Sequence, residues 1–288
     1  MKKLFIGLLT LIMSLSVMCC NKENTSESDK VQVYTSFYAM YDFAKMIGGD
    51  MADIYMLCPP GQEPHEFEPT ARDIANLTDS DIFIYNGMGM EHWADTVVEV
   101  LKSNDVICIN TAYNAPFITD SNDPHVWLNP KNAYSQMNEI CSAFVLADPK
   151  NAEYYKSNLD ICRGKIDTLI NDYESAVDNF KSRDIIVSHD AYSNLCHAFG
   201  MNQIPINGID NHNDPSPARL AEVEAYIKDN GITHIFKEPL GTGTIEETIA
   251  NDTATEILVL DPFEGNIEGK DYFTVMYENL NALITALS

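Results

Sequence analysis

Short runs rich in β-branched, aromatic and other strand-forming residues alternate along the chain with segments whose apolar residues stand three or four positions apart. In the first half, the strand-like runs cover 31–34, 54–57, 82–85 and 106–109, and helical spacing covers 39–47 and 70–77. Towards the end, the strand-like runs cover 185–187, 234–236 and 257–260, and helical spacing covers 191–199, 244–251 and about 272–287. Strands that alternate with helices are typical of βαβ units. The pattern predicts two α/β lobes, each with a central, mostly parallel sheet.

The stretch 149–182, between these two regions, has a different pattern. Its apolar residues keep a spacing of three and four throughout, with no proline after Pro149 and a single glycine, Gly164. This spacing predicts one helix of about thirty residues, on the order of 45 Å long at 1.5 Å per residue. Such a helix would join the two lobes as a rigid rod. Two helices that break at Gly164 are the alternative.

The N-terminal residues are expected to be an export signal. Lys2 and Lys3 precede an uncharged apolar run, 4–17, which is followed by Cys19 and Cys20. The run is too short for a comfortable transmembrane helix and is typical of a secretory signal. A cysteine at its end indicates a bacterial lipoprotein signal, in which Cys20 (or Cys19) carries the lipid. Plain secretion is the alternative.

These segments define the expected domain organisation. The polar stretch NKENTSESDK after the signal has the composition of a flexible tether. The expected units are a signal peptide at 1–20, the tether at 21–30, an N-terminal lobe at 31–148, the connecting helix at 149–182 and a C-terminal lobe at 183–288.

Composition narrows the possible functions. The 288 residues include 18 Lys and Arg against 43 Asp and Glu, for a formal net charge of −25. A surface this negative would repel nucleic acid and anionic lipid and would attract cations, so nucleic-acid binding is excluded. The cysteines after the signal form no C-x-x-C pair, which argues against a thiolate zinc site. The H-E-x-x-H, G-x-S-x-G and G-x-x-x-x-G-K motifs of common enzymes are absent from the sequence.

Four side chains with metal-binding chemistry lie in corresponding loops. His65 lies in a loop that prolines constrain, and His125 lies in a similar turn before a helix. His189 and Asp261 each follow a predicted strand. Open α/β sheets place their ligand residues in loops at the carboxyl ends of the strands. If the lobes face each other, these three imidazoles and one carboxylate would form a nearly complete shell for Zn²⁺.

The remaining histidines are not expected to bind this metal, because they lie on apolar faces or in solvated segments. They are His92, His197, His212 and His234.

Several sequence blocks together resemble a known family. They are PPGQEPHEFEPTARDI at 59–74, DSDIFIYNGMGMEHW at 79–93, DPHVWLNP at 123–130, SHDAYSNLCHAFG at 188–200, DPSPARLAEV at 214–223 and LVLDPF at 258–263. The chain is similar to the ZnuA/TroA-like lipoproteins, the substrate-binding components of zinc or manganese ABC importers. This resemblance implies two α/β lobes joined by one long helix, with the metal in the cleft between them.

The resemblance also implies a ligand set of His65, His125, His189 and Asp261. Manganese-type members usually have glutamate where this chain has His189, and imidazole at that position favours Zn²⁺ over the harder Mn²⁺. Many zinc-type members carry a long histidine-rich loop before the second ligand. The corresponding stretch here, 112–122, contains no histidine.

Three acidic residues are close enough in sequence to orient these ligands through hydrogen bonds. They are Glu66, Glu68 and Asp190.

The function implied by the resemblance is that of a receptor and not of an enzyme. We expect an extracytoplasmic monomer, lipid-anchored to the cell membrane or periplasmic, that captures Zn²⁺ and delivers it to the permease and ATPase of an ABC importer. A manganese-specific or mixed receptor is the alternative within the family. A zinc-dependent hydrolase and a surface adhesin are alternatives from other classes. The hydrolase would need an open coordination position, which Asp261 would fill.

Overall fold

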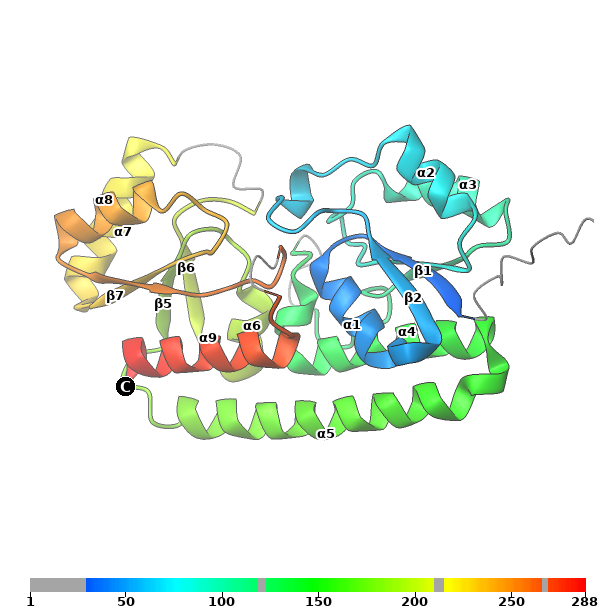
Figure 1. The fold of residues 1–288 in the computed structure, drawn as a ribbon. Coiled ribbons are helices and arrows are strands. Elements are labelled where there is room, and N and C mark those ends of the chain that lie inside the picture. Colours follow the sequence, from blue (N-terminus) through cyan, green and yellow to red (C-terminus); the bar gives the residue numbers. More distant parts are fainter. Residues whose placement is uncertain (1–29, 119–122, 210–214, 266–268) are drawn as a thin grey trace, which may run out of the picture.

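The computed structural model describes residues 30–118, 123–209, 215–265 and 269–288. The predicted signal peptide, most of the tether, Cys19, Cys20 and His212 lie outside the described residues. Two lobes stand side by side, and one long helix runs beneath both (Figure 1). No helix within the described ranges combines the length and apolar character needed to cross a bilayer.

The N-terminal lobe is built on four parallel strands whose side chains are mostly buried or partly buried. Their order across the sheet is β2 (Ala52–Met56), β1 (Val31–Thr35), β3 (Ile82–Tyr85) and β4 (Ile107–Asn110). Helices α1 (Tyr38–Gly48) and α4 (Pro130–Ala147) lie on one side of the sheet, and α2 (Ala71–Thr78) and α3 (Ala94–Lys102) lie on the other (Figure 1). Single 3-10 turns follow α1 (η1, Gly49–Met51) and precede α2 and α4 (η2, Pro64–Glu66; η3, Val126–Leu128).

The C-terminal lobe contains two pairs of parallel strands. β5 (Asp184–Val187) pairs with β6 (Asn202–Pro205), and β7 (His234–Lys237) pairs with β8 (Glu256–Val259). β5 also contacts β7. The helices are α6 (Ser193–Phe199), α7 (Pro217–Asn230), α8 (Thr244–Thr253) and α9 (Tyr272–Leu287). The predicted two-lobed α/β architecture is therefore confirmed.

The hydrophobic pattern does not predict every element. Strand β6 (Asn202–Pro205) has polar residues at its start, ends at a proline and is only half-buried. An edge strand of this kind has no continuous apolar run, because it packs on one side only. Helices α3 and α7 were also absent from the predicted elements.

The long connecting helix is continuous. After a single turn, η4 (Pro149–Asn151), helix α5 runs from Ala152 to Val177 through Gly164. A glycine inside a helix costs about 1 kcal/mol relative to alanine, which does not break a helix that neighbouring elements support. Here α5 packs against α1 and α4 in one lobe and against α6 and α9 in the other. One helix is therefore confirmed, although it is shorter than predicted, and the two-helix alternative is wrong.

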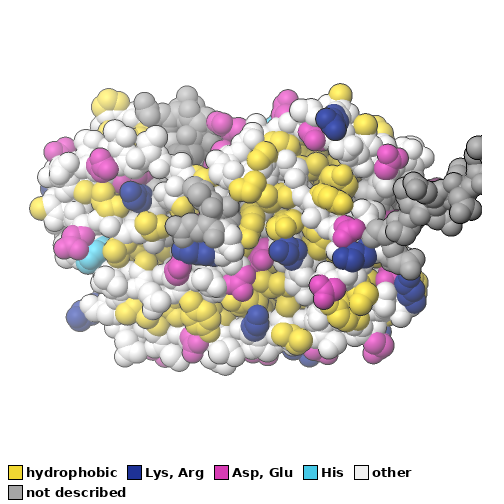
Figure 2. Space-filling view, viewed as in Figure 1, with side chains coloured by type: hydrophobic (Ala, Val, Ile, Leu, Met, Phe, Trp, Pro, Cys, Tyr) yellow, Lys and Arg dark blue, Asp and Glu magenta, His cyan; other side chains and the backbone are white. Residues whose placement is uncertain are grey.

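One large hydrophobic core connects the sheet of the N-terminal lobe with α5, α9 and part of the C-terminal lobe. A second, smaller core lies within the C-terminal lobe around Ile186, Ile227 and Ile235. The expected domain boundaries at 148 and 182 stay a prediction. Acidic side chains are scattered over both lobes on the face shown in Figure 2 and do not gather in one patch.

Candidate metal centre

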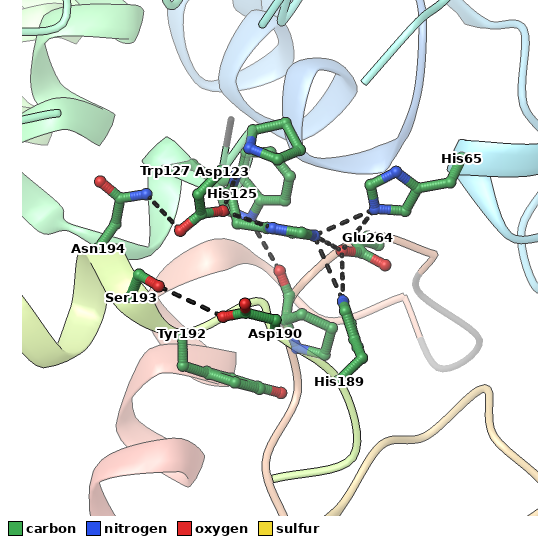
Figure 3. A network of polar contacts seen from close by, with 12 residues as sticks. His65, Asp123, His125, Trp127, His189, Asp190, Tyr192, Ser193, Asn194 and Glu264 are labelled. Atoms are coloured by element: carbon green, nitrogen blue, oxygen red, sulfur yellow. Dashed lines mark hydrogen bonds and ion pairs between the residues drawn. The ribbon is translucent and has the colours of Figure 1, made fainter. Parts of the chain in front are cut away.

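Four side chains from separate loops converge between the lobes. They are His65, His125, His189 and Glu264, and one potential ligand atom of each lies within 4.8 Å of the others (Figure 3). Two come from the N-terminal lobe and two from the C-terminal lobe. Three of the four predicted ligands are thus brought together, and a glutamate joins them.

The local sequence places each of the three histidines in a loop or turn near the carboxyl ends of the strands of a sheet. His65 lies in η2, where the carboxylate of Glu63 accepts the backbone N–H of His65 at 3.3 Å. His125 directly precedes η3. His189 follows the end of β5 by two residues. Loops at this edge are where open α/β sheets bind ligands.

The spacing of the four atoms suits a small divalent cation. The Nε2 atom of His125 lies 3.1 Å from Nε2 of His65 and 3.4 Å from Nε2 of His189. Oε1 of Glu264 lies 2.7 Å from Nε2 of His125 and 3.8 Å from each of the other two Nε2 atoms. Ligands about 2.0–2.1 Å from a tetrahedral Zn²⁺ are about 3.3 Å apart. The observed separations lie on both sides of this value.

Two of the imidazoles are oriented by carboxylates behind them. Nδ1–H of His125 donates to Oδ1 of Asp123 at 2.7 Å, and the same oxygen accepts the backbone N–H of His125 at 2.9 Å. Nδ1–H of His189 donates to Oε1 of Glu238. A proton held on Nδ1 leaves the Nε2 lone pair free, and here both Nε2 atoms face the centre of the group.

Glu264 has an oxygen that suits a cation. The side chain is about 1% exposed, and its Oε1 atom faces the Nε2 atoms of all three histidines, with that of His125 nearest at 2.7 Å. A buried carboxylate is costly unless positive charge compensates it, so this oxygen favours a cation at the centre of the histidines. The donor set of three imidazoles and one carboxylate therefore fits Zn²⁺.

The pKa values show how strongly the group attracts positive charge. Burial lowers the pKa of His125, but hydrogen bonds to Asp123 and Glu264 outweigh burial and raise the pKa to about 10. Burial would raise the pKa of Glu264, yet the hydrogen bond to His125 and the neighbouring imidazoles hold it well below its usual range. Without metal, a proton on His125 thus balances the carboxylate. A divalent cation would replace that proton.

Burial also affects neighbouring groups. Burial alone would lower the pKa of His189, but the negative charge of Glu238 outweighs this effect. The pKa of His189 is therefore raised. Burial and the charge of Glu264 raise the pKa of Glu63 to about 7. The charges of Glu238 and Glu264 therefore both favour the protonated form of His189.

Asp261 is the one expected ligand that the structure leaves outside the group. Its Oδ1 atom accepts the backbone N–H of Phe263 at 2.7 Å, and its own N–H and C=O are both bonded to the side chain of Asn279. Asp261 thus starts a turn, a common role for aspartate before proline. Phe263 has a φ of 62°, in the left-handed region, and the chain after it presents Glu264 to the histidines. Burial raises the pKa of Asp261 to about 6.

Sequence proximity was also a poor guide to the residues that orient the ligands. Glu68 pairs with the exposed His92 at 3.1 Å, and Asp190 bonds to Ser193 and Gln203. The expected role of Glu68 and Asp190 in orienting the metal-binding histidines is therefore not seen. Glu66 lies in the same η2 turn as His65. Asp123 and Glu238 are the carboxylates that contact the imidazoles. Asp123 stands two residues before His125, a spacing that could have revealed it.

The other described histidines remain apart from this centre. His92 pairs with Glu68 and is half-exposed, and His234 lies 3.8 Å from an exposed glutamate, Glu256. His197 lies on α6 and is not a member of the group.

Comparisons with known proteins give consistent matches. The family model for the periplasmic zinc-uptake complex component A, ZnuA, matches residues 33–286. The high-affinity zinc uptake system protein ZnuA of Bacillus subtilis is 31% identical over 300 residues, which cover 95% of this chain and 94% of that protein. The zinc-binding protein AdcA of Streptococcus pyogenes is 32% identical over 285 residues, covering 88% of this chain but 55% of AdcA. The chain therefore spans about half of that longer relative.

A solved structure agrees with these matches. The crystal structure of the Zn(II)-bound ZnuA-like domain of Streptococcus pneumoniae AdcA has a TM-score of 0.81 at 30% identity and covers 90% of this chain and 99% of its own. Proteins of this family are substrate-binding receptors that carry the metal as cargo, which confirms the expectation of a receptor and not an enzyme. The chain belongs to the family of zinc-uptake complex component A proteins, which serve ABC importers.

Proposed function

We propose that this chain is an extracytoplasmic receptor that binds Zn²⁺ through His65, His125, His189 and Glu264 and delivers the ion to the permease of an ABC importer. The observation that carries the proposal is the convergence of three Nε2 atoms and one carboxylate oxygen within 4.8 Å of one another. The zinc-binding relatives and the zinc-bound structure support the choice of metal. Glu264 takes the place expected for Asp261.

The donor chemistry favours zinc over manganese. Zn²⁺ accepts nitrogen donors and four ligands, whereas Mn²⁺ prefers oxygen donors and higher coordination numbers. Three of the four proposed donors are imidazole nitrogens, and two of these rings are hydrogen-bonded to carboxylates that raise their basicity.

The division of ligands between the lobes supports a simple route for release. His65 and His125 belong to the N-terminal lobe, and His189 and Glu264 belong to the C-terminal lobe. Separation of the lobes would leave two ligands on each side, and a two-ligand site holds zinc far less tightly than a complete shell. The rigid helix α5, which packs against both lobes, would keep such a movement small.

The proposal includes the attachment of the chain to the cell surface. Lipid on Cys20 (or Cys19) would hold a monomer near its permease, and the polar stretch 21–30 would let the receptor reach it. These residues lie outside the described part of the chain, and the support comes from the sequence pattern and from a relative named a zinc-binding lipoprotein.

Titration calorimetry tests the proposal. Metal-stripped protein is titrated separately with Zn²⁺ and Mn²⁺, and we expect one Zn²⁺ to bind per chain, with Mn²⁺ binding much more weakly. Zinc binding should release protons, so the observed heat should depend on the ionisation enthalpy of the buffer. Tighter binding of Mn²⁺ than of Zn²⁺ would support the manganese alternative, and no saturable binding of either ion would contradict the receptor itself.

A further inference from the structure

The turn that carries His125 is held in place by the opposite lobe. The Nδ2 amide of Asn194, on α6, donates to Oδ2 of Asp123 at 2.9 Å. Nε1–H of Trp127 donates to the carbonyl of Pro262 at 2.7 Å, and the Tyr272 hydroxyl donates to the carbonyl of Trp127 at 2.8 Å. Residues on both sides of His125 are therefore bonded across the lobe boundary (Figure 3).

The bond from Asn194 is the one that leads directly to a ligand. Asp123 uses one oxygen, Oδ1, to accept from the ring and the backbone of His125, and the other, Oδ2, to accept from Asn194. Asp123 is 2% exposed and Asn194 is fully buried, so water does not readily replace either partner. The amide of one lobe therefore fixes the carboxylate that fixes the imidazole of the other lobe.

Asn194 is energetically unfavourable at this buried position. Its Oδ1 atom is buried and has no hydrogen-bond partner among the described residues. An unsatisfied buried acceptor destabilises the folded state, and an apolar side chain of similar size would avoid that penalty. The hydrogen bond to Asp123 is the interaction that an apolar side chain could not replace.

We propose that Asn194 is a positioning residue of the metal site, which orients His125 through Asp123 and thereby makes metal affinity depend on the contact between the lobes. This inference rests on the proposed function, because it concerns the same ligands. When the lobes part, Asp123 loses its donor from α6 at the same time as the two halves of the site separate. The His125 ring is then less firmly held, and release is easier.

The test compares Asn194→Ala and Asn194→Leu with the intact protein. The leucine variant keeps the volume of the side chain and protects against failure of the alanine variant to fold. We expect Zn²⁺ affinity, measured by competition with a chromophoric chelator, to fall about tenfold or more in both variants. The visible spectrum of bound Co²⁺, which reports the coordination geometry, should also change.

Asn158→Ala is the matched control. Asn158 also donates a side-chain hydrogen bond between elements, from α5 to the carbonyl of Ile47 at 2.9 Å, but it lies outside the metal site. This variant should lose stability without any change in Zn²⁺ affinity or in the Co²⁺ spectrum. Thermal unfolding of all variants separates a loss of stability from a loss of site geometry.

A double-mutant cycle tests whether the effect passes through Asp123. If it does, Asn194→Ala should add little to the loss of affinity that Asp123→Ala causes alone. An Asn194 effect that persists in full without Asp123 overturns the inference, as do unchanged Zn²⁺ affinity and Co²⁺ spectra in both Asn194 variants. If the intact protein binds zinc and His65→Ala weakens it, such results leave the proposed function standing.

Discussion

Two buried carboxylates, Glu264 and Asp42, each contact segments far away in the chain. Their surroundings shift the pKa values of the two groups in opposite directions. Glu264 lies among three imidazoles, which hold its pKa well below the usual range. Asp42, on α1, faces the start of α9, where it accepts the backbone N–H of Tyr272 at 2.8 Å. Burial and, to a smaller extent, the charge of Asp271 raise the pKa of Asp42 to about 7, because the Tyr272 N–H and two lysines compensate the charge only in part.

The difference shows what makes a buried acid a binding site. Burial disfavours the charged carboxylate in both places, but only Glu264 has several donors that can share a cation with it. Asp42 instead joins α1 to the start of α9 and is not part of the group of potential metal ligands. The comparison predicts that substitutions around Glu264 change zinc affinity and that substitution of Asp42 changes only stability.

Loss of a histidine ligand should have the largest effect. His65→Ala or His189→Ala removes one of four donors, and His125→Ala also removes the proton-binding partner of Glu264. We expect each variant to bind Zn²⁺ at least about 100-fold more weakly in chelator competition. His92→Ala is the control, because His92 is half-exposed and pairs with Glu68. Unchanged affinity in two of the three ligand variants would contradict the site.

Substitution of Glu264 should have the next largest effect on zinc affinity, and substitution of its neighbour Asp261 should have little. Glu264→Gln removes the charge that faces the histidines and should weaken zinc binding by about 100-fold, whereas Asp261→Asn should change it by less than about threefold. Asp261 is the matched control, because it is an acidic residue of the same loop and is partly buried. The reverse order of effects, measured in the same competition assay, would show that Asp261 is the ligand.

The sequence predicted three of the proposed ligands but not the fourth, for a physical reason. The histidines could be found because each lies in a loop near the carboxyl end of a sheet. Asp261 and Glu264 are three residues apart, and the conformation of Phe263 decides which of them faces the centre. Its left-handed φ is held by packing against Tyr38 and Tyr272, from the other lobe and from α9. This information is absent from the local sequence.

The distinction between local sequence patterns and contacts between distant segments also applies to the rest of the molecule. Helix α9 was predicted almost to the residue, because its apolar spacing is a local property. Glu238 could not be assigned to His189 in advance, because the two residues are 49 positions apart and meet only when β7 lies beside β5.

Loss of the Glu238 charge should have a smaller effect than loss of a ligand. Glu238→Gln keeps an acceptor for Nδ1–H of His189 but removes the negative charge that makes the ring more basic. We expect zinc affinity to fall about tenfold. Glu246→Gln is a suitable control, because Glu246 is equally buried but accepts from Ser188 and not from a ligand. Equal losses in both variants would point to a general effect of lost negative charge.

Substitution of Asp42 should leave zinc affinity unchanged and alter only the pH dependence of stability. The folded protein holds a proton on Asp42 up to a pKa of about 7, whereas the unfolded chain releases it near 3.8. The folded state therefore binds more protons between about pH 4 and pH 7, and its stability falls across that window as pH rises. Each pKa unit corresponds to about 1.4 kcal/mol, so the loss is at most a few kcal/mol.

The variant Asp42→Asn tests this pH dependence, because it keeps an oxygen for the N–H of Tyr272 and has no charge to bury. The free energy of unfolding of metal-free Asp42→Asn, measured in urea from pH 4 to pH 8, should fall less steeply than that of the intact protein and should exceed it above pH 7. Parallel curves for the two proteins would show that Asp42 is already charged in the folded state, and that its surroundings compensate a buried carboxylate as well as the histidines compensate Glu264.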